Sequence, residues 1–159
     1  MKRKSISKTT RQKVLDKYGG HCAYCGKELD LKTLRVDHLH PHYRGGEDSF
    51  ENYMPACYQC NFYKSTFLLE EFREQMSTLH ERISKPFIAR LGLDYGIIKI
   101  EPFDGKFYFE EVEWMLETEL EYYERMLEEL AKYPTPFLSH AMAYVNLRIM
   151  NLKKDVTEW

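Results

Sequence analysis

Four cysteines stand in two pairs whose spacing suits a metal ion. Each pair is a Cys-x-x-Cys motif, Cys22–Cys25 and Cys57–Cys60, and 31 residues separate the two motifs. A two-residue spacer lets a tight turn point both sulfurs at one ion, and two such turns complete a tetrahedral four-cysteine site that favours zinc. A redox-active pair is the alternative, but it needs only one motif in a βαβ setting that the sequence lacks. Because four protein ligands leave no open position for water, we expect this zinc to be structural.

The residues that could take part in a reaction lie between and directly after the cysteine pairs. Asp37 and His38 are adjacent, Asn52 follows a polar loop, and Asn61 comes after the last cysteine. Imidazole titrates near neutral pH and can take a proton from water. Carboxylate and amide oxygens suit a hard cation such as Mg²⁺ or Mn²⁺. Neighbours in a strand point to opposite faces, so Asp37 and His38 can share one site only at a distorted strand end.

In this order, the motifs resemble those of the HNH endonuclease family. The resemblance is close over residues 21–64, which hold a cysteine pair, Asp-His, the Gly-Gly loop, an asparagine, and a second cysteine pair followed by asparagine. To about residue 110, the chain is similar to small HNH proteins of phages and prophages. The resemblance implies an α+β fold with a ββα-metal core. It also implies a metal-dependent DNA endonuclease that hydrolyses phosphodiester bonds.

The resemblance further implies a role for each matching residue. His38 would be the general base, while Asp37 and Asn61 would hold the catalytic divalent ion. Asn52 would brace the loop and help to orient His38. Many relatives have histidine where this chain has Asn61, and an amide oxygen beside a carboxylate favours Mg²⁺ or Mn²⁺ more than an imidazole does.

Charge is unevenly distributed along the chain. Residues 1–69 carry 12 Lys and Arg against 7 Asp and Glu, a formal charge of +5, whereas residues 70–159 carry −7. A basic segment suits a polyanion, because phosphate contacts release counterions; a solvated basic face is the alternative. Four basic side chains are candidates for contacts with double-stranded DNA: Arg11, Lys13, Arg44 and Lys64.

Short elements must position these residues. The pattern predicts a basic helix at 7–18, a strand at 34–39 and a second strand at 53–56. After Cys60 the sequence turns helical, with an apolar stripe over residues 67–83. We expect residues 1–69 to form one domain, with the basic helix and the four-cysteine zinc site.

Residues 70–159 are predicted to form a mainly helical, acidic extension. Apolar segments flank Asp104-Gly105 and predict a short β-hairpin near 97–109. The connector at 133–136 predicts a C-terminal αα-hairpin. Its two helices carry apolar residues at four-three spacing: Leu116, Leu120, Tyr123, Leu127 and Leu130, then Leu138, Met142, Val145, Ile149 and Leu152.

The sequence also limits the compartment and the partners. It holds no apolar run long enough to span a membrane and no apolar stretch behind the basic N-terminus. We therefore expect a cytoplasmic protein of a bacterial or phage-infected cell, with no membrane partner. The C-terminal seams favour packing within the chain, with a homodimer as the alternative. Phage packaging machinery is a further candidate partner; homing and host defence are equally open biological roles.

Two rival functions explain less of the sequence. A non-catalytic zinc-ribbon DNA-binding module accounts for the cysteines and the basic segment, but not for Asp37, His38, Asn52 and Asn61 together. An interaction protein built on the acidic C-terminal helices accounts only for about the last fifty residues.

Overall fold

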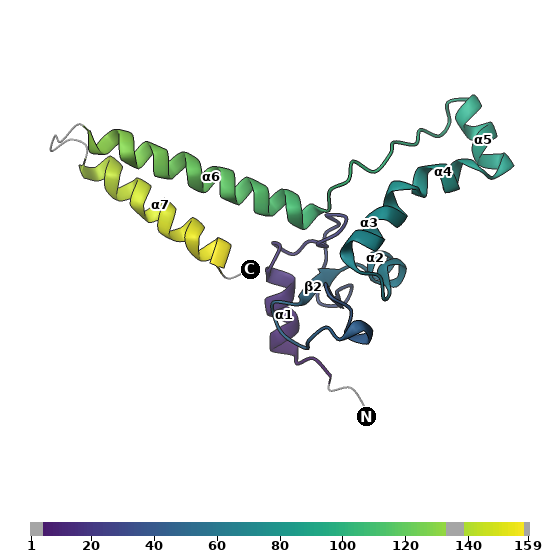
Figure 1. Ribbon diagram of the computed structural model, residues 1–159, viewed down its shortest axis with the longest axis horizontal. Coiled ribbons are helices and arrows are strands. Elements are labelled where there is room, and N and C mark those ends of the chain that lie inside the picture. Colours follow the sequence, from purple (N-terminus) through teal and green to yellow (C-terminus); the bar gives the residue numbers. More distant parts are fainter. Residues whose placement is uncertain (1–4, 133–138, 158–159) are drawn as a thin grey trace. The chain divides into compact units, whose positions relative to one another are not determined.

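The computed structural model describes residues 5–132 and 139–157, and the chain divides into two compact units (Figure 1). Unit 1 spans residues 1–108 and unit 2 spans residues 109–159. Within the described residues, no helix is both long enough and apolar enough to cross a membrane.

Unit 1 begins with helix α1, Lys8–Asp16, as the sequence predicts. Ser7 caps this helix, because its hydroxyl oxygen accepts a hydrogen bond from the Thr10 backbone N–H at 3.0 Å. Val14 and Leu15 are buried, so the basic helix has one apolar face turned to the interior.

Two short strands and one helix form the centre of unit 1. Strand β1, Arg35–His38, pairs antiparallel with strand β2, Tyr53–Ala56, so that His38 stands opposite Tyr53. Helix α2, Tyr58–Lys64, follows β2 almost directly and packs on β1. Strand β2 is buried along its whole length, and α1 lies against it. The predicted order of two strands and a helix in an α+β fold is confirmed.

The connection from β1 to β2 is a tight loop that contains the 3-10 turn η1, His42–Arg44. Gly46 closes this loop on the backbone of His40. A Cβ atom at Gly46 would lie 1.9 Å from the His40 carbonyl oxygen, so no other residue fits without moving the chain. The loop is therefore held close to the end of β1.

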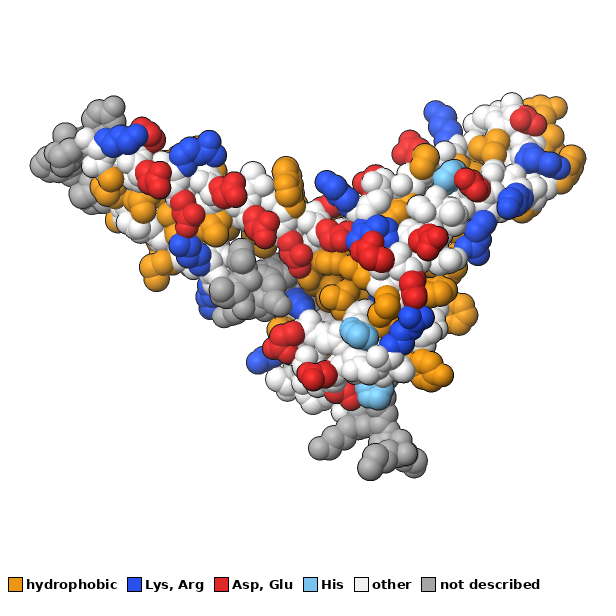
Figure 2. All heavy atoms as spheres, viewed as in Figure 1, with side chains coloured by type: hydrophobic (Ala, Val, Ile, Leu, Met, Phe, Trp, Pro, Cys, Tyr) orange, Lys and Arg blue, Asp and Glu red, His pale blue; other side chains and the backbone are white. Residues whose placement is uncertain are grey.

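Three helices follow α2: α3, Leu69–Ser77; α4, Leu79–Ser84; and α5, Phe87–Asp94. The apolar stripe predicted over residues 67–83 is only partly buried. Phe72 is 1% exposed, but Ile83 is 46% exposed. The helix is interrupted between α3 and α4, so its apolar positions no longer share one face. Figure 2 shows apolar side chains on the surface at α5.

An aromatic cluster joins helix α3 to the segment before Tyr108 within unit 1. The ring of Phe72 lies 5.4 Å from that of Tyr24 and stacks on Phe107 at 5.0 Å between centroids. Phe107 is 1% exposed, and the Tyr108 backbone N–H donates to the Tyr24 carbonyl. The segment to Tyr108 is therefore part of the same core.

The β-hairpin predicted near 97–109 is not formed. Residues 97–107 contain no strand, and the paired strands described in the chain are β1 and β2. The Asp104 carboxylate accepts from the Lys106 backbone N–H at 3.0 Å, so the turn exists without the ladder. A lone hairpin is only marginally stable, and here Phe107 packs on Phe72 while Ile97 is 81% exposed.

Unit 2 is a pair of helices, α6, Tyr108–Ala131, and α7, Ser139–Thr157, as the sequence predicts. They run antiparallel side by side (Figure 1), and Arg148 and Lys153 of α7 pair with Glu119 and Glu124 of α6. Three seam positions of α7 are buried: Val145, Ile149 and Leu152. Acidic side chains line α6 in Figure 2. The connector at 133–136 and the seam position Leu138 lie outside the described residues.

Candidate active site and metal centre

The four cysteines come together as the spacing predicts. One sulfur from each of Cys22, Cys25, Cys57 and Cys60 lies within 4.8 Å of the other three. The Cys25 and Cys57 sulfurs are 3.9 Å apart, close to the edge of about 3.8 Å that follows for a tetrahedron with metal–sulfur bonds of about 2.3 Å. Backbone N–H groups also point at the sulfurs: Cys57 N lies 3.3 Å from Cys22 Sγ, and Cys60 N lies 3.4 Å from Cys57 Sγ. The four cysteines are therefore positioned to hold a metal ion.

The electrostatics of this cluster favour a cation. Hydrogen bonds from Cys22 and Cys60 lower the pKa of Cys25 to about 3, whereas hydrogen bonds to Cys22 and Cys25 raise the pKa of Cys60. Ionisation of all four sulfurs at once is opposed, because adjacent thiolates repel one another. A dication between them would remove this conflict. Since Cys57 also caps α2, such an ion would fix the start of that helix against the first cysteine turn.

Asp37 lies in a buried network at the centre of β1. Its Oδ2 atom accepts from the Tyr24 hydroxyl at 2.5 Å and from the Lys64 ammonium at 2.8 Å. Burial, followed by the charge of Asp37, raises the pKa of Tyr24 well above its ordinary value, so Tyr24 stays a donor. Both contacts use Oδ2; within the described residues, Asp37 Oδ1 makes no hydrogen bond.

The structure corrects the expectation for Lys64. Its side chain is 0% exposed, and its Nζ atom also donates to the His38 carbonyl oxygen at 2.7 Å. A buried ammonium that is paired in this way cannot reach a phosphate. The prediction that Lys64 contacts the DNA backbone is therefore wrong; Lys64 ties α2 to the end of β1.

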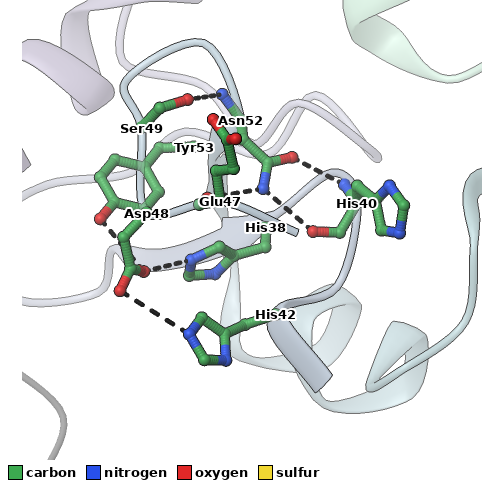
Figure 3. Close-up of polar contacts among 8 residues, drawn as sticks. All are labelled: His38, His40, His42, Glu47, Asp48, Ser49, Asn52 and Tyr53. Atoms are coloured by element: carbon green, nitrogen blue, oxygen red, sulfur yellow. Dashed lines mark hydrogen bonds and ion pairs between the residues drawn. The ribbon is translucent and has the colours of Figure 1, made fainter. Parts of the chain in front are cut away.

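His38 is enclosed by a second cluster on the loop side of β1 (Figure 3). Its Nε2 atom lies 2.7 Å from Asp48 Oδ1, and the Tyr53 hydroxyl donates to the same oxygen at 3.4 Å. The His42 Nε2 atom lies 3.8 Å from Asp48 Oδ2. The rings of Tyr53 and His42 meet that of His38 edge to face, at 5.1 and 5.8 Å. The imidazole is 5% exposed and held in one orientation.

Sequence reasoning missed Asp48. It stands ten residues beyond His38 in a loop that also contains Glu47 and Glu51. A histidine that accepts protons needs a partner at its other nitrogen, so an acid in this loop was the signal available. The spacing could not say which of the three acids folds back onto the ring.

The Asn52 side chain bonds to the loop between β1 and β2 at three points. Its side-chain oxygen accepts from the His40 backbone N–H at 2.8 Å, and its Nδ2 atom donates to the carbonyl oxygens of His40 and Glu47 at 3.0 and 2.9 Å (Figure 3). The Asn52 carbonyl accepts from Leu39 N at 2.8 Å. Asn52 therefore holds the backbone that follows His38.

Asn61 lies on α2, three residues before Lys64, so the two residues are neighbours on the surface of the helix. Its side chain is half-buried and makes no hydrogen bond to any other described residue. The structure brings Asp37 and Lys64 into contact. Asn61 is the polar side chain next to Lys64 on the surface of α2.

The other basic candidates differ in their surroundings. The Arg11 Nη2 atom donates to the carbonyl oxygens of Leu31 and Leu34, both at 3.1 Å, and so supports the chain before β1. Arg44 is exposed and pairs with Glu71 at 2.9 Å. Lys13 is exposed on α1. Arg44 and Lys13 are thus the two that solvent reaches most readily.

Comparison with known proteins agrees with this geometry. Residues 22–67 match the family described as HNH endonuclease, and a search of curated proteins finds no match. The matched segment begins at the first cysteine and ends just beyond Lys64, so it includes both cysteine pairs, β1, β2 and α2. Residues 22–67 are therefore similar to the HNH endonuclease family, a family of nucleases.

Proposed function

We propose that this protein is a metal-dependent DNA endonuclease that hydrolyses phosphodiester bonds, with His38 as the general base. The observation that carries the proposal is the contact of His38 Nε2 with Asp48 Oδ1 at 2.7 Å. His38 directly follows the buried Asp37 in the chain. An ionised carboxylate only accepts hydrogen bonds, so the neutral imidazole carries its proton on Nε2. Nδ1 is then the nitrogen that takes a proton from water.

The residues around the second proposed metal fit a hard cation. Asp37 Oδ1 and the amide oxygen of Asn61 would hold Mg²⁺ or Mn²⁺, both of which prefer oxygen ligands. Such an ion, when bound, neutralises charge that develops on the phosphate and the leaving oxygen. The chain's own contribution is orientation: Tyr24 and Lys64 grip Asp37 Oδ2 and leave the other oxygen without a protein hydrogen bond among the described residues.

Two further residues position the base. Asp48 fixes the ring of His38 and favours one tautomer. Asn52 holds the loop of residues 40–47 in place through three hydrogen bonds. Because His38 is 5% exposed, the attacking water must enter between the surrounding rings.

The proposed substrate is double-stranded DNA, with Lys13 and Arg44 as contacts to its backbone.

The protein partners expected from the sequence also stand as proposals. A homodimer through the C-terminal helices is supported by exposed apolar side chains on both: Trp114, Met115, Tyr122, Tyr144, Leu147 and Met150. Light scattering of the full chain tests it, since a single-chain mass at high concentration removes the dimer. Phage packaging machinery is tested by gene neighbourhood.

Plasmid nicking by matched variants tests the catalytic proposal. His38→Ala should lose about 10²- to 10⁴-fold in rate while keeping its zinc content and its DNA binding. Asp37→Ala and Asn61→Ala should be partly rescued by excess Mg²⁺ or Mn²⁺, whereas His38→Ala should not. Asp48→Asn should lower the rate less than His38→Ala. Full activity of His38→Ala, or DNA binding by the wild type without nicking, would favour the zinc-ribbon DNA-binding module instead.

A further inference from the structure

Helix α2 carries two large aromatic side chains on its outer surface. Tyr58 is 60% exposed and Phe62 is 70% exposed. Their rings stack with 5.8 Å between centroids and 19° between planes. The Arg35 guanidinium lies 6.0 Å from the Tyr58 centroid, within reach of a cation–π interaction. Arg35, Tyr58 and Phe62 thus form a row that we call the aromatic platform.

The aromatic platform lies on the same helix as Asn61 and on the same strand as Asp37. Successive residues of a helix are turned by about 100°, so that Asn61 lies between the buried Lys64 and the exposed pair Tyr58 and Phe62 round the helix. On the strand side, Arg35 stands two residues before Asp37. A phosphate at Asp37 and Asn61 would therefore place its neighbouring nucleotide near the aromatic platform.

This set of groups fits the chemistry of an unpaired nucleotide. Aromatic rings bind nucleobases through stacking, which tolerates every base because each one has a π face. A base inside a duplex is already covered on both faces by its neighbours, so only an unpaired base offers a free face. The positive charge of Arg35 suits the phosphate of the same nucleotide. The row combines both contacts within one helix and one strand.

We propose that the aromatic platform stacks an unpaired DNA base beside the scissile phosphate, so that the enzyme favours gapped, flapped or branched DNA over an intact duplex. The proposal rests on the proposed function, since it assigns the kind of DNA that this site receives. Phe62, the more exposed of the two rings, is the expected stacking surface for the base, and the ring of Tyr58 stacks on Phe62.

The test measures how tightly the full chain binds two DNAs. Mg²⁺ and Mn²⁺ are left out, so the assay reports binding and not cleavage. One DNA is an intact duplex; the other has the same sequence with a short single-stranded gap that carries 2-aminopurine, whose fluorescence falls on stacking. Phe62→Ala removes the ring, and Phe62→Tyr keeps one. The matched control is Phe87→Ala on α5, a phenylalanine that is also 70% exposed. Zinc content and circular dichroism verify that each variant is folded.

We expect Phe62→Ala to weaken binding to gapped DNA by about 5- to 150-fold and to abolish the fluorescence change. Its affinity for the intact duplex should stay the same, and Phe62→Tyr and Phe87→Ala should behave as the wild type. If Phe62→Ala matches Phe87→Ala on gapped DNA, the proposal is overturned and the rings serve another contact, such as a protein. Equal loss on both DNAs would also overturn it, in favour of a groove contact.

Nicking, measured separately, keeps the two proposals distinct. A chain that nicks DNA but shows no stacking disproves only the aromatic platform. A chain that stacks the base but never nicks with Mg²⁺ or Mn²⁺ disproves the proposed function and leaves only the binding of an unpaired base.

Discussion

Replacing Lys64 by methionine tests the buried network directly. The substitution keeps the length of the side chain and removes the ammonium, which is 0% exposed and bonds to Asp37 Oδ2 and to the His38 carbonyl oxygen. It leaves a buried carboxylate with one hydrogen-bond donor, Tyr24, among the described residues. Removing one partner of a buried ion pair costs about 3–5 kcal/mol in free energy of unfolding. We expect a loss of that size for unit 1.

Amide hydrogen exchange measures this loss separately for each unit. In zinc-saturated protein, the amides of β1 and β2 should lose protection by roughly a hundredfold to a few thousandfold in Lys64→Met, since about 1.4 kcal/mol corresponds to a factor of ten. The α6–α7 amides should change little. Lys13→Met is the matched control, because Lys13 is exposed and surface changes of this kind stay within about 0.5 kcal/mol.

Two results would contradict the buried ion pair. The first comes from a double-mutant cycle with Asp37→Asn. Residues in contact should show a coupling of about 0.5–3 kcal/mol, so purely additive effects would contradict the ion pair. The second is salt dependence. A lysine that contacts phosphate contributes about 0.9 to the slope of log affinity against log salt, so a lower slope in Lys64→Met would place this ammonium on DNA after all.

Two further predictions concern the scaffold and the loop. Purified protein should contain about one zinc per chain, and Cys57→Ser should lose the zinc and unfold the segment around the cysteines while α6 and α7 keep their helical signal; full retention of zinc would contradict the four-sulfur site. Asn52→Ala should lower the nicking rate less than His38→Ala, because Asn52 acts through the backbone of His40; a loss equal to that of His38→Ala would mean that it contributes to chemistry directly.

The parts of the fold that follow local rules could be predicted from the sequence. Ser7 caps a helix, Arg35–His38 forms a strand, and two Cys-x-x-Cys turns meet at one point. These features depend on residues within a few positions of one another, or on a metal that imposes its own geometry. Their boundaries therefore differ from the predicted ones by only a few residues.

The predictions that failed depend on packing between distant residues. A hairpin near 97–109 satisfies local propensity, yet Phe107 packs on Phe72, and no strand ladder forms among the described residues there. Strand propensity mainly reflects packing against a neighbouring surface, and here that surface is the aromatic cluster rather than a second strand. The same cluster includes Phe107 in unit 1.

Lys64 shows why polar site residues are the hardest to assign. A lysine after a cysteine turn is expected at the surface, since lysine is almost never fully buried unless it is paired. Its partner, Asp37, lies 27 positions earlier, and no periodicity connects the two. The ammonium joins α2 to β1 by gripping the carboxylate on one oxygen and the carbonyl of the proposed base. Lys64, which the sequence analysis predicted to contact DNA, thus holds in place Asp37 and His38, the two residues proposed to act on the DNA.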